Sequence, residues 1–170
     1  MMAVVDTNVP VVANGCSEQA SNACVLSCVQ KIREITQKGN RLLLDSSWHI
    51  ITEYQQNLRS SGQPGVGDGF LRWVLTNRAN PERCSLVHIT SCDDLVFEEF
   101  PNDPELGNFD RDDRKFVAVA LAYYNAHSTN PTVLVAVDRG WWNYRQSLAR
   151  NKVIVEFLCP EDIQELANDT

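Results

Sequence analysis

Short apolar runs alternate with longer segments of helical periodicity along the chain. Five runs have the length of buried strands, at residues 3–5, 42–44, 86–89, 133–137 and 153–157. Helices are expected between and after them, at residues 17–38, from 46 or 47 to 58, 70–78, 114–124, about 140–149, and beyond 157. Residues 59–69, with four glycines and a proline, are expected to form a loop. This alternation predicts an α/β fold with a mainly parallel sheet that helices cover on both faces.

Length and composition are typical of one folded domain spanning residues 1–170. At this length folding buries about 70% of the surface of the unfolded chain, which is enough for a core. A hydrophobic fraction of 44% and a charged fraction of 22% exclude a disordered or fibrous chain. The net charge of −7, from 15 basic and 22 acidic residues, disfavours a membrane-surface protein or a generic DNA binder.

Targeting signals and cysteines bear on the location of the protein. Apolar runs are far shorter than the roughly 20 residues that cross a bilayer, so no membrane partner is expected. Asp6 interrupts the first apolar run before a secretory signal could form, and we therefore expect a cytoplasmic protein. The six cysteines form no Cys-x-x-Cys pair, and we expect six reduced thiols, several of them core residues: Cys16, Cys24, Cys28, Cys84, Cys92 and Cys159.

Acidic residues directly follow three of the predicted strands, as Asp6, Asp45 and Asp138. In a parallel sheet the carboxyl ends of the strands meet at one edge, where ligands bind. Asp45 precedes two serines at the start of a helix, so we expect it to cap that helix. Asp6 and Asp138 are therefore candidates for a site at this edge.

Two further acids are expected near the same edge. Asp113 precedes the most apolar helix of the chain, and Glu53 lies about two turns into the helix after the second strand. Carboxylates that converge in one cleft repel one another unless a cation lies among them. Oxygen ligands suit Mg²⁺ or Mn²⁺, and such a site is typical of phosphodiester hydrolysis.

Four segments of the chain carry a family resemblance: AVVDTNV (3–9), SSWHIITEYQQNL (46–58), DRKFVAVALAY (113–123) and VLVAVDRGWWN (133–143). In order and spacing, the chain resembles the PIN-domain ribonucleases over residues 2–160. The resemblance implies a three-layer α/β/α sandwich and a metal-dependent endoribonuclease that acts on single-stranded RNA. It places Asp6, Glu53, Asp113 and Asp138 at the family's acidic, metal-binding positions, with Asn8 in support.

The chain departs from the family pattern in some places, and one acidic position has more than one candidate. Asp110 and Asp112 stand beside the third acidic position, and Asp113 is chosen because it places Val117 and Ala118 at buried small-residue positions. The segment 59–105 is longer than the corresponding segment in the compact toxins of toxin–antitoxin pairs. Two residues before the fourth acid, this chain has Ala136 where many relatives carry Thr or Ser. Similarity to those toxins implies a protein inhibitor or antitoxin and a homodimer as possible partners.

Residues near the acids are candidates for substrate binding. Arg139 and Arg114 are placed to hold a phosphate backbone, although solvated helix faces are an equal alternative. Trp141 and Trp142 follow the fourth acid, and we expect one of them, assigned to Trp142, to stack on a base while the other lies in the core.

Two alternative functions remain open at this point. A phosphatase on a related α/β fold would carry Asp-x-Asp after the first strand, whereas this chain has Asp6, Thr7 and Asn8. A PIN-like module that binds RNA or a protein without catalysis is the other alternative.

Overall fold

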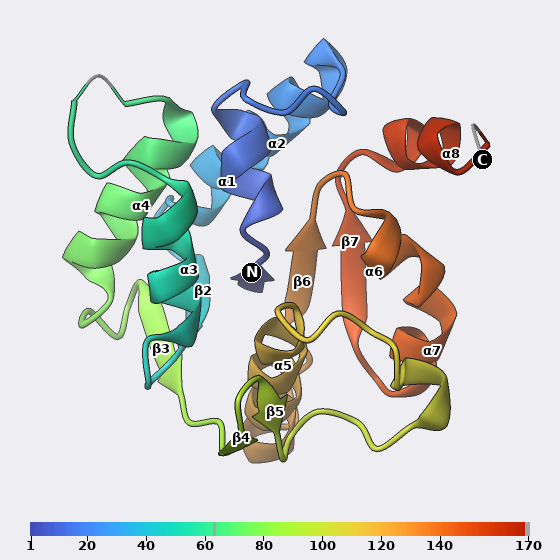
Figure 1. Cartoon of the computed structure of the whole chain (residues 1–170). Helices are drawn as coiled ribbons and strands as arrows, with labels where there is room; N and C mark the ends of the chain where they lie inside the picture. Colours follow the sequence, from blue (N-terminus) through green and yellow to red (C-terminus); the bar gives the residue numbers. More distant parts are fainter. Residues whose placement is uncertain (63, 169–170) are drawn as a thin grey trace.

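A five-stranded parallel sheet forms the centre of the molecule (Figure 1). The computed structural model describes residues 1–62 and 64–168. The strand order is β3-β2-β1-β6-β7, and every neighbouring pair is parallel. The strands are β1 (Met2–Val5), β2 (Arg41–Asp45), β3 (Cys84–Val87), β6 (Thr132–Val135) and β7 (Ile154–Phe157). Helices flank this sheet in a three-layer α/β/α sandwich, which confirms the predicted fold class.

The helices pack in groups that do not strictly follow the order of the chain, since α3 lies against β2 and α5. α1, α2 and α4 pack against one another, α5 packs on β1, β2, β3 and β6, and α6 contacts α7 and α8. Their bounds are α1 (Asn8–Ala13), α2 (Asn22–Ile35), α3 (His49–Asn57), α4 (Val66–Asn77), α5 (Arg114–His127), α6 (Arg139–Asn143), α7 (Arg145–Arg150) and α8 (Pro160–Asn168). Between β3 and α5 lie a two-stranded antiparallel hairpin and a short 3-10 helix: β4 (Ser91–Asp93), β5 (Val96–Phe97) and η1 (Pro104–Leu106).

Buried apolar side chains on both faces of the central strands hold the layers together. Leu42, Leu43 and Leu44 of β2 are fully buried, as continuous apolar runs in parallel sheets usually are. The predicted small-residue positions Val117 and Ala118 of α5 are also fully buried. Short side chains at these positions let α5 lie close to the sheet.

Several predicted boundaries were wrong. The helix expected at 17–38 is shorter and corresponds to α2, Asn22–Ile35. It begins after Ser21, whose side chain accepts a hydrogen bond from the Cys24 amide at 3.2 Å. α1 was not predicted at all. α4 begins four residues before the expected helix at 70, because the Asp68 carboxylate accepts a hydrogen bond from the Gly65 amide at 3.0 Å and caps its first turn.

The second half of the chain shows similar shifts. β3 lies two residues before the expected strand at 86–89, and the helix expected at 140–149 is divided into α6 and α7 at Tyr144. Between the strand expected at 86–89 and the helix expected at 114–124, where no element was predicted, the chain forms β4, β5 and η1.

The expectation of six reduced thiols was wrong for one pair. Cys24 and Cys159 form a disulfide between α2 and the residue that precedes α8. They are 135 residues apart, and cysteine spacing cannot reveal a pairing that the folded topology creates. Within residues 1–62 and 64–168, no helix is long and apolar enough to span a membrane.

A candidate acidic metal centre

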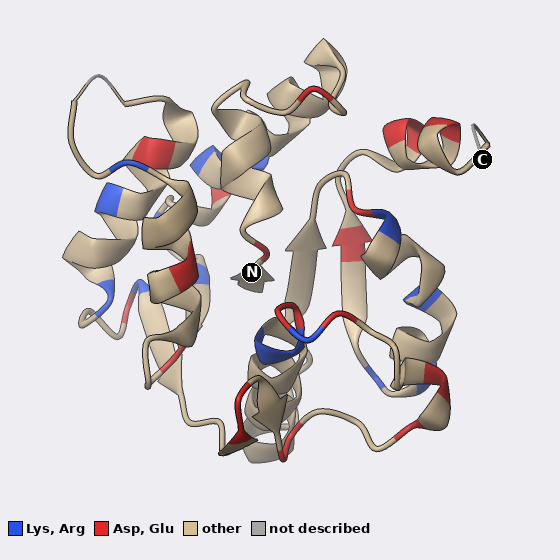
Figure 2. Ribbon diagram, viewed as in Figure 1, with Lys and Arg blue, Asp and Glu red and all other residues tan. Residues whose placement is uncertain are grey.

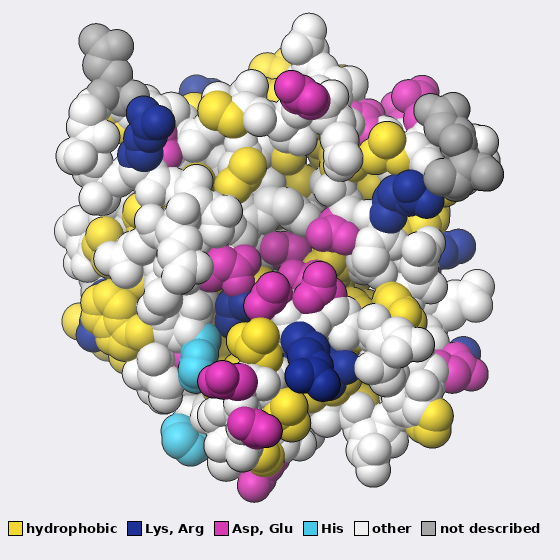
Figure 3. Space-filling view, in the orientation of Figure 1, with side chains coloured by type: hydrophobic (Ala, Val, Ile, Leu, Met, Phe, Trp, Pro, Cys, Tyr) yellow, Lys and Arg dark blue, Asp and Glu magenta, His cyan; other side chains and the backbone are white. Residues whose placement is uncertain are grey.

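Asp6 and Asp138 lie at the same edge of the sheet because they follow adjacent parallel strands. β1 and β6 pair through Val5 and Leu134, and the Asp6 amide donates to the Leu134 carbonyl at 3.0 Å. Acidic residues also lie on α3 and before α5 around the same centre (Figure 2). Figure 3 shows acidic side chains gathered in the middle of this face, with basic side chains beside them.

Asn8 ties the two strand ends together. Its backbone amide donates to Oδ1 of Asp6 at 3.3 Å, and its side-chain amide donates to Oδ2 of Asp138 at 3.4 Å. Its side-chain oxygen accepts from the amide of Ala136 at 2.8 Å. Asn8 therefore orients both carboxylates from one position, the first turn of α1.

The Asp6 carboxyl is in an environment that disfavours its ionised form. The residue is 3% exposed, and its Oδ2 atom has no hydrogen-bond partner among the described residues. Burial and then the charge of Asp138 raise the pKa of Asp6 to about 8. Burial also raises the pKa of Asp138, although amides of Trp141 and Gly140 stabilise its ionised form.

Asp113 adds a third carboxyl from the start of α5, where it occupies the N-cap position. Burial, followed by the charges of Asp6, Asp138, Asp110 and Glu53, raises its pKa to about 9. These interactions place Asp113 within electrostatic reach of the other three predicted acids. Asp110, whose charge also raises the pKa of Asp113, is itself exposed to solvent.

Glu53 lies on α3 beside the other acids and forms an ion pair. Its carboxylate pairs with the ammonium of Lys115, which also donates to the carbonyl of Asp112. Lys115 is 4% exposed, so the pair is largely shielded from water. This ion pair was not predicted, since nothing in the sequence spacing of the two residues indicates it.

The donor set fits a hard divalent cation. Four carboxylates, one with an unpartnered buried oxygen, offer the ligands that Mg²⁺ and Mn²⁺ prefer. Among the described residues, no three of these acids offer oxygens within 4.8 Å of one another. Binding by all four would therefore need side-chain movement or bridging water molecules, which Mg²⁺ commonly retains.

Asp45 acts as a helix cap, as predicted. Its two carboxylate oxygens accept hydrogen bonds from the amides of Ser47, His49 and Ile50 at 3.1, 2.9 and 2.8 Å. These contacts satisfy the first amides of α3 and fix the helix that carries Glu53.

The predicted substrate-binding residues have different surroundings. The Arg114 guanidinium donates to the carbonyls of Gly107 and Phe109, so it organises the loop before α5. Trp142 packs edge-on against Phe157, with the guanidinium of Arg145 4.3 Å above its ring. Both side chains therefore make contacts within the protein. The third candidate, Arg139, is exposed at the first position of α6. The neighbouring Trp141 is fully buried.

A cavity of about 230 Å³ adjoins the acidic residues and was not predicted. Its lining includes Glu53 and Lys115 together with Trp48, His49 and Gln56. Trp48 remains 38% exposed at the cavity and has the guanidinium of Arg78 3.9 Å from its ring centre.

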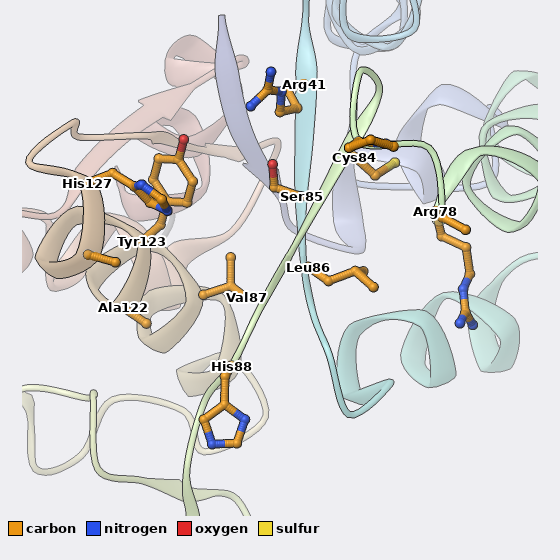
Figure 4. Close-up of a pocket in the computed structure, with 13 residues that line it drawn as sticks. Arg41, Arg78, Cys84, Ser85, Leu86, Val87, His88, Ala122, Tyr123 and His127 are labelled. Carbon is orange, nitrogen blue, oxygen red and sulfur yellow. The ribbon is translucent and has the colours of Figure 1, made fainter.

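A larger cavity, of about 570 Å³, lies beside β3 and shares none of the four predicted acids. Figure 4 shows Tyr123 and His127 on one side of β3 and Arg78 on the other. Its lining offers cationic and aromatic groups but no carboxylate ligand for a hard divalent cation.

Comparisons with models of known families, with curated proteins and with solved structures find no match. The arrangement of the acidic residues and the motifs that carry them are therefore the features that indicate a function.

Proposed function

We propose that this protein is a metal-dependent endoribonuclease, similar to PIN-domain ribonucleases, that hydrolyses phosphodiester bonds of single-stranded RNA. The observation that carries the proposal is the meeting of Asp6, Glu53, Asp113 and Asp138 at the carboxyl edge of a parallel sheet. They come from four separate segments, and burial together with charge repulsion among them raises the pKa of Asp6 and Asp113. Such an arrangement is costly unless a cation offsets the charge.

In the proposed reaction some residues bind the metal and others orient the metal ligands. Asp6, Glu53 and Asp113 bind Mg²⁺ or Mn²⁺ directly or through water, and Asp138 completes the cluster or holds a second ion. When bound, the metal activates the attacking water and neutralises charge on the scissile phosphate. Asn8 holds the carboxylates of Asp6 and Asp138 in orientation through its hydrogen bonds. The protein forms no covalent intermediate with the substrate.

The same proposal extends to partners and location. An RNA substrate is consistent with a cytoplasmic protein, and similarity to toxin ribonucleases suggests an antitoxin-like inhibitor and a homodimer. Light scattering on the purified protein measures the oligomeric state directly.

A cleavage time course on labelled single-stranded RNA tests the central proposal. It compares Mn²⁺, Mg²⁺ and EDTA, and uses Asp6→Asn, purified in parallel, as the control for contaminating nuclease. We expect metal-dependent cleavage that the substitution reduces at least about 100-fold, since even residues that only orient metal ligands contribute 10–100-fold.

The alternative functions give different results in the same experiments. Hydrolysis of a small phosphomonoester with RNA left intact would favour the phosphatase. RNA binding that survives Asp6→Asn, without cleavage by the wild type, would favour a non-catalytic binding module.

A further inference from the structure

Three cysteine sulfurs meet at the junction of α2 with the segment between β7 and α8. Cys24 and Cys28 lie one turn apart on α2, and Cys159 precedes α8. Their Sγ atoms all lie within 4.8 Å of one another, and the residues are 3%, 0% and 4% exposed, respectively. In the structure Cys24 and Cys159 are joined as a disulfide, and Cys28 is a free thiol beside them.

Contacts on both sides of the cysteines hold these two segments together independently of the disulfide. The backbone amide and hydroxyl of Ser21 donate to the Asp162 carboxylate at 2.6 and 2.9 Å. On the other side, the Lys31 ammonium pairs with the Glu156 carboxylate at 2.9 Å. Because each partner lies three residues along the chain from a cysteine of the cluster, we expect the three thiols to remain facing one another when the disulfide is reduced.

We propose that the reduced cluster of Cys24, Cys28 and Cys159 is a binding site for one soft, thiophilic metal ion of the Cu⁺ type. Metal–thiolate bonds of about 2.3 Å would separate three sulfurs on one ion by roughly 4 Å, so Cys28 already lies close enough to the other two, which are within 4.8 Å of it. Sγ of Cys24 and Cys159 move apart once their bond is reduced. Disulfide formation and metal binding therefore exclude each other at this site.

The chemistry of the donors selects the class of ion. Thiolate ligands favour Cu⁺ and Zn²⁺ over Mg²⁺ or Mn²⁺, so this site is distinct in kind from the acidic cluster. Zn²⁺ usually takes four ligands. Among the described residues no histidine or carboxylate joins the cysteine group, and its burial leaves little room for water. Three sulfurs alone suit a monovalent ion.

An exchange reaction among the three sulfurs is the main alternative for this cluster. Thiol–disulfide exchange requires a thiolate as the attacking group. Burial raises the pKa of Cys28 to about 12, with a smaller contribution from the charge of Asp162, so this thiol is a poor nucleophile in the metal-free protein. A bound cation, in contrast, stabilises the thiolate directly.

The proposed step is balanced without any redox change at the metal. A dithiol reductant supplies two electrons and two protons to the Cys24–Cys159 bond and becomes a disulfide itself. The ion then binds three sulfurs, and the protons of the thiols pass to solvent. Neither step involves the acidic cluster, so this proposal does not depend on the proposed ribonuclease activity.

Titration with Cu⁺ under anaerobic, reducing conditions tests the site, with a Cu⁺-selective chelator as competitor. The exposed thiols are first removed as Cys16→Ser and Cys92→Ser, and Cys84→Ser serves as the matched buried control. We expect one equivalent of Cu⁺ with three sulfur neighbours by X-ray absorption. Cys28→Ser should weaken binding at least about 100-fold, because loss of a ligand exceeds the 10–100-fold effect of an outer-shell change.

Three outcomes would overturn the proposal. These are failure of the reduced protein to retain Cu⁺, equal binding by the Cys28→Ser and Cys84→Ser variants, and preference for Zn²⁺ in a parallel titration. The oxidised protein provides a test that needs no substitution at the cluster, since the closed disulfide should abolish binding. Equal Cu⁺ binding before and after oxidation of the disulfide would also contradict the proposal.

Discussion

Glu53 and Lys115 form an ion pair that joins α3 to α5 inside the acidic cluster. Lys115 lies two residues after Asp113 and is almost fully buried. Its ammonium is a positive charge that the protein itself supplies among the acids, and it partly offsets the rise in the pKa of Asp6 that burial and the charge of Asp138 cause. The pair thus partly offsets the repulsion that burial and neighbouring carboxylates create.

Removal of Lys115 alone should therefore destabilise the metal-free protein more than removal of the whole pair. Lys115→Met leaves the Glu53 carboxylate without its partner among like charges, whereas Glu53→Gln with Lys115→Met removes both charges. We expect a coupling energy of about 1 kcal/mol or more in a double-mutant cycle measured by urea unfolding in EDTA.

The exposed ion pair between Glu105 and Arg150 provides the control for this cycle. Coupling between exposed charges is weak because water screens them. A Glu53–Lys115 coupling no larger than that of this surface pair would contradict the structural interpretation.

Stability of the metal-free protein should fall as the pH rises from about 4 to 8. In the unfolded chain Asp6 ionises near its ordinary pKa of 3.8, whereas in the folded protein its pKa is about 8. Within that window the folded state binds more protons, so deprotonation favours unfolding. Asp113, with a pKa of about 9, extends the effect to higher pH.

Thermal unfolding in EDTA across this pH range measures the effect. We expect Asp6→Asn to flatten the decline and saturating Mg²⁺ to raise the Tm at pH 8, because the ion binds only the folded state. Asp103→Asn is the control, since hydrogen bonds lower the pKa of that carboxyl. Equal slopes for the wild type and Asp6→Asn would show that burial of Asp6 does not govern the response.

Loss of the Asn8 side chain should reduce catalysis while the fold remains intact. Asn8→Ala removes the contacts with Asp138 and the Ala136 amide, and both groups then lose their fixed partner. We expect kcat to fall about 10–100-fold, the usual range for residues that orient metal ligands. RNA cleavage rates and Tm, measured in parallel, separate a positioning role from general destabilisation; an unchanged kcat would exclude that role.

The location of the acids was predictable because it follows from local rules. Asp6 comes directly after β1, and Asp138 lies three residues beyond the end of β6, so the parallel strands bring both to one edge although the strand expected at 133–137 ends at Val135. Asp45 is the last residue of β2, and the adjacent serines correctly indicated a cap. Strand ends and helix caps can be predicted from sequence because each depends on a few neighbouring residues.

Features created by distant contacts were not predictable in the same way. The Cys24–Cys159 disulfide and the Glu53–Lys115 pair each join segments that only the completed topology brings together. α1 was missed because its six residues include a proline and are too short to show helical periodicity.

Gly67 marks a close contact between α1 and α4 that a single methyl group should disrupt. A Cβ atom at Gly67 would lie 1.9 Å from the carbonyl oxygen of Pro10, so one of the two helices would have to shift. We expect Gly67→Ala to destabilise the protein by about 1–3 kcal/mol, as overpacking of a tight interface does. Urea unfolding monitored by circular dichroism measures this change.

Gly69, two residues further along α4, is the matched control because a Cβ there would meet nothing within 4 Å. Alanine is favoured over glycine in helices by about 1 kcal/mol, so Gly69→Ala should leave stability unchanged or raise it. The opposite signs expected in one helix separate the steric contact with Pro10 from helix propensity. Stabilisation by both substitutions would mean that α1 and α4 do not approach each other this closely.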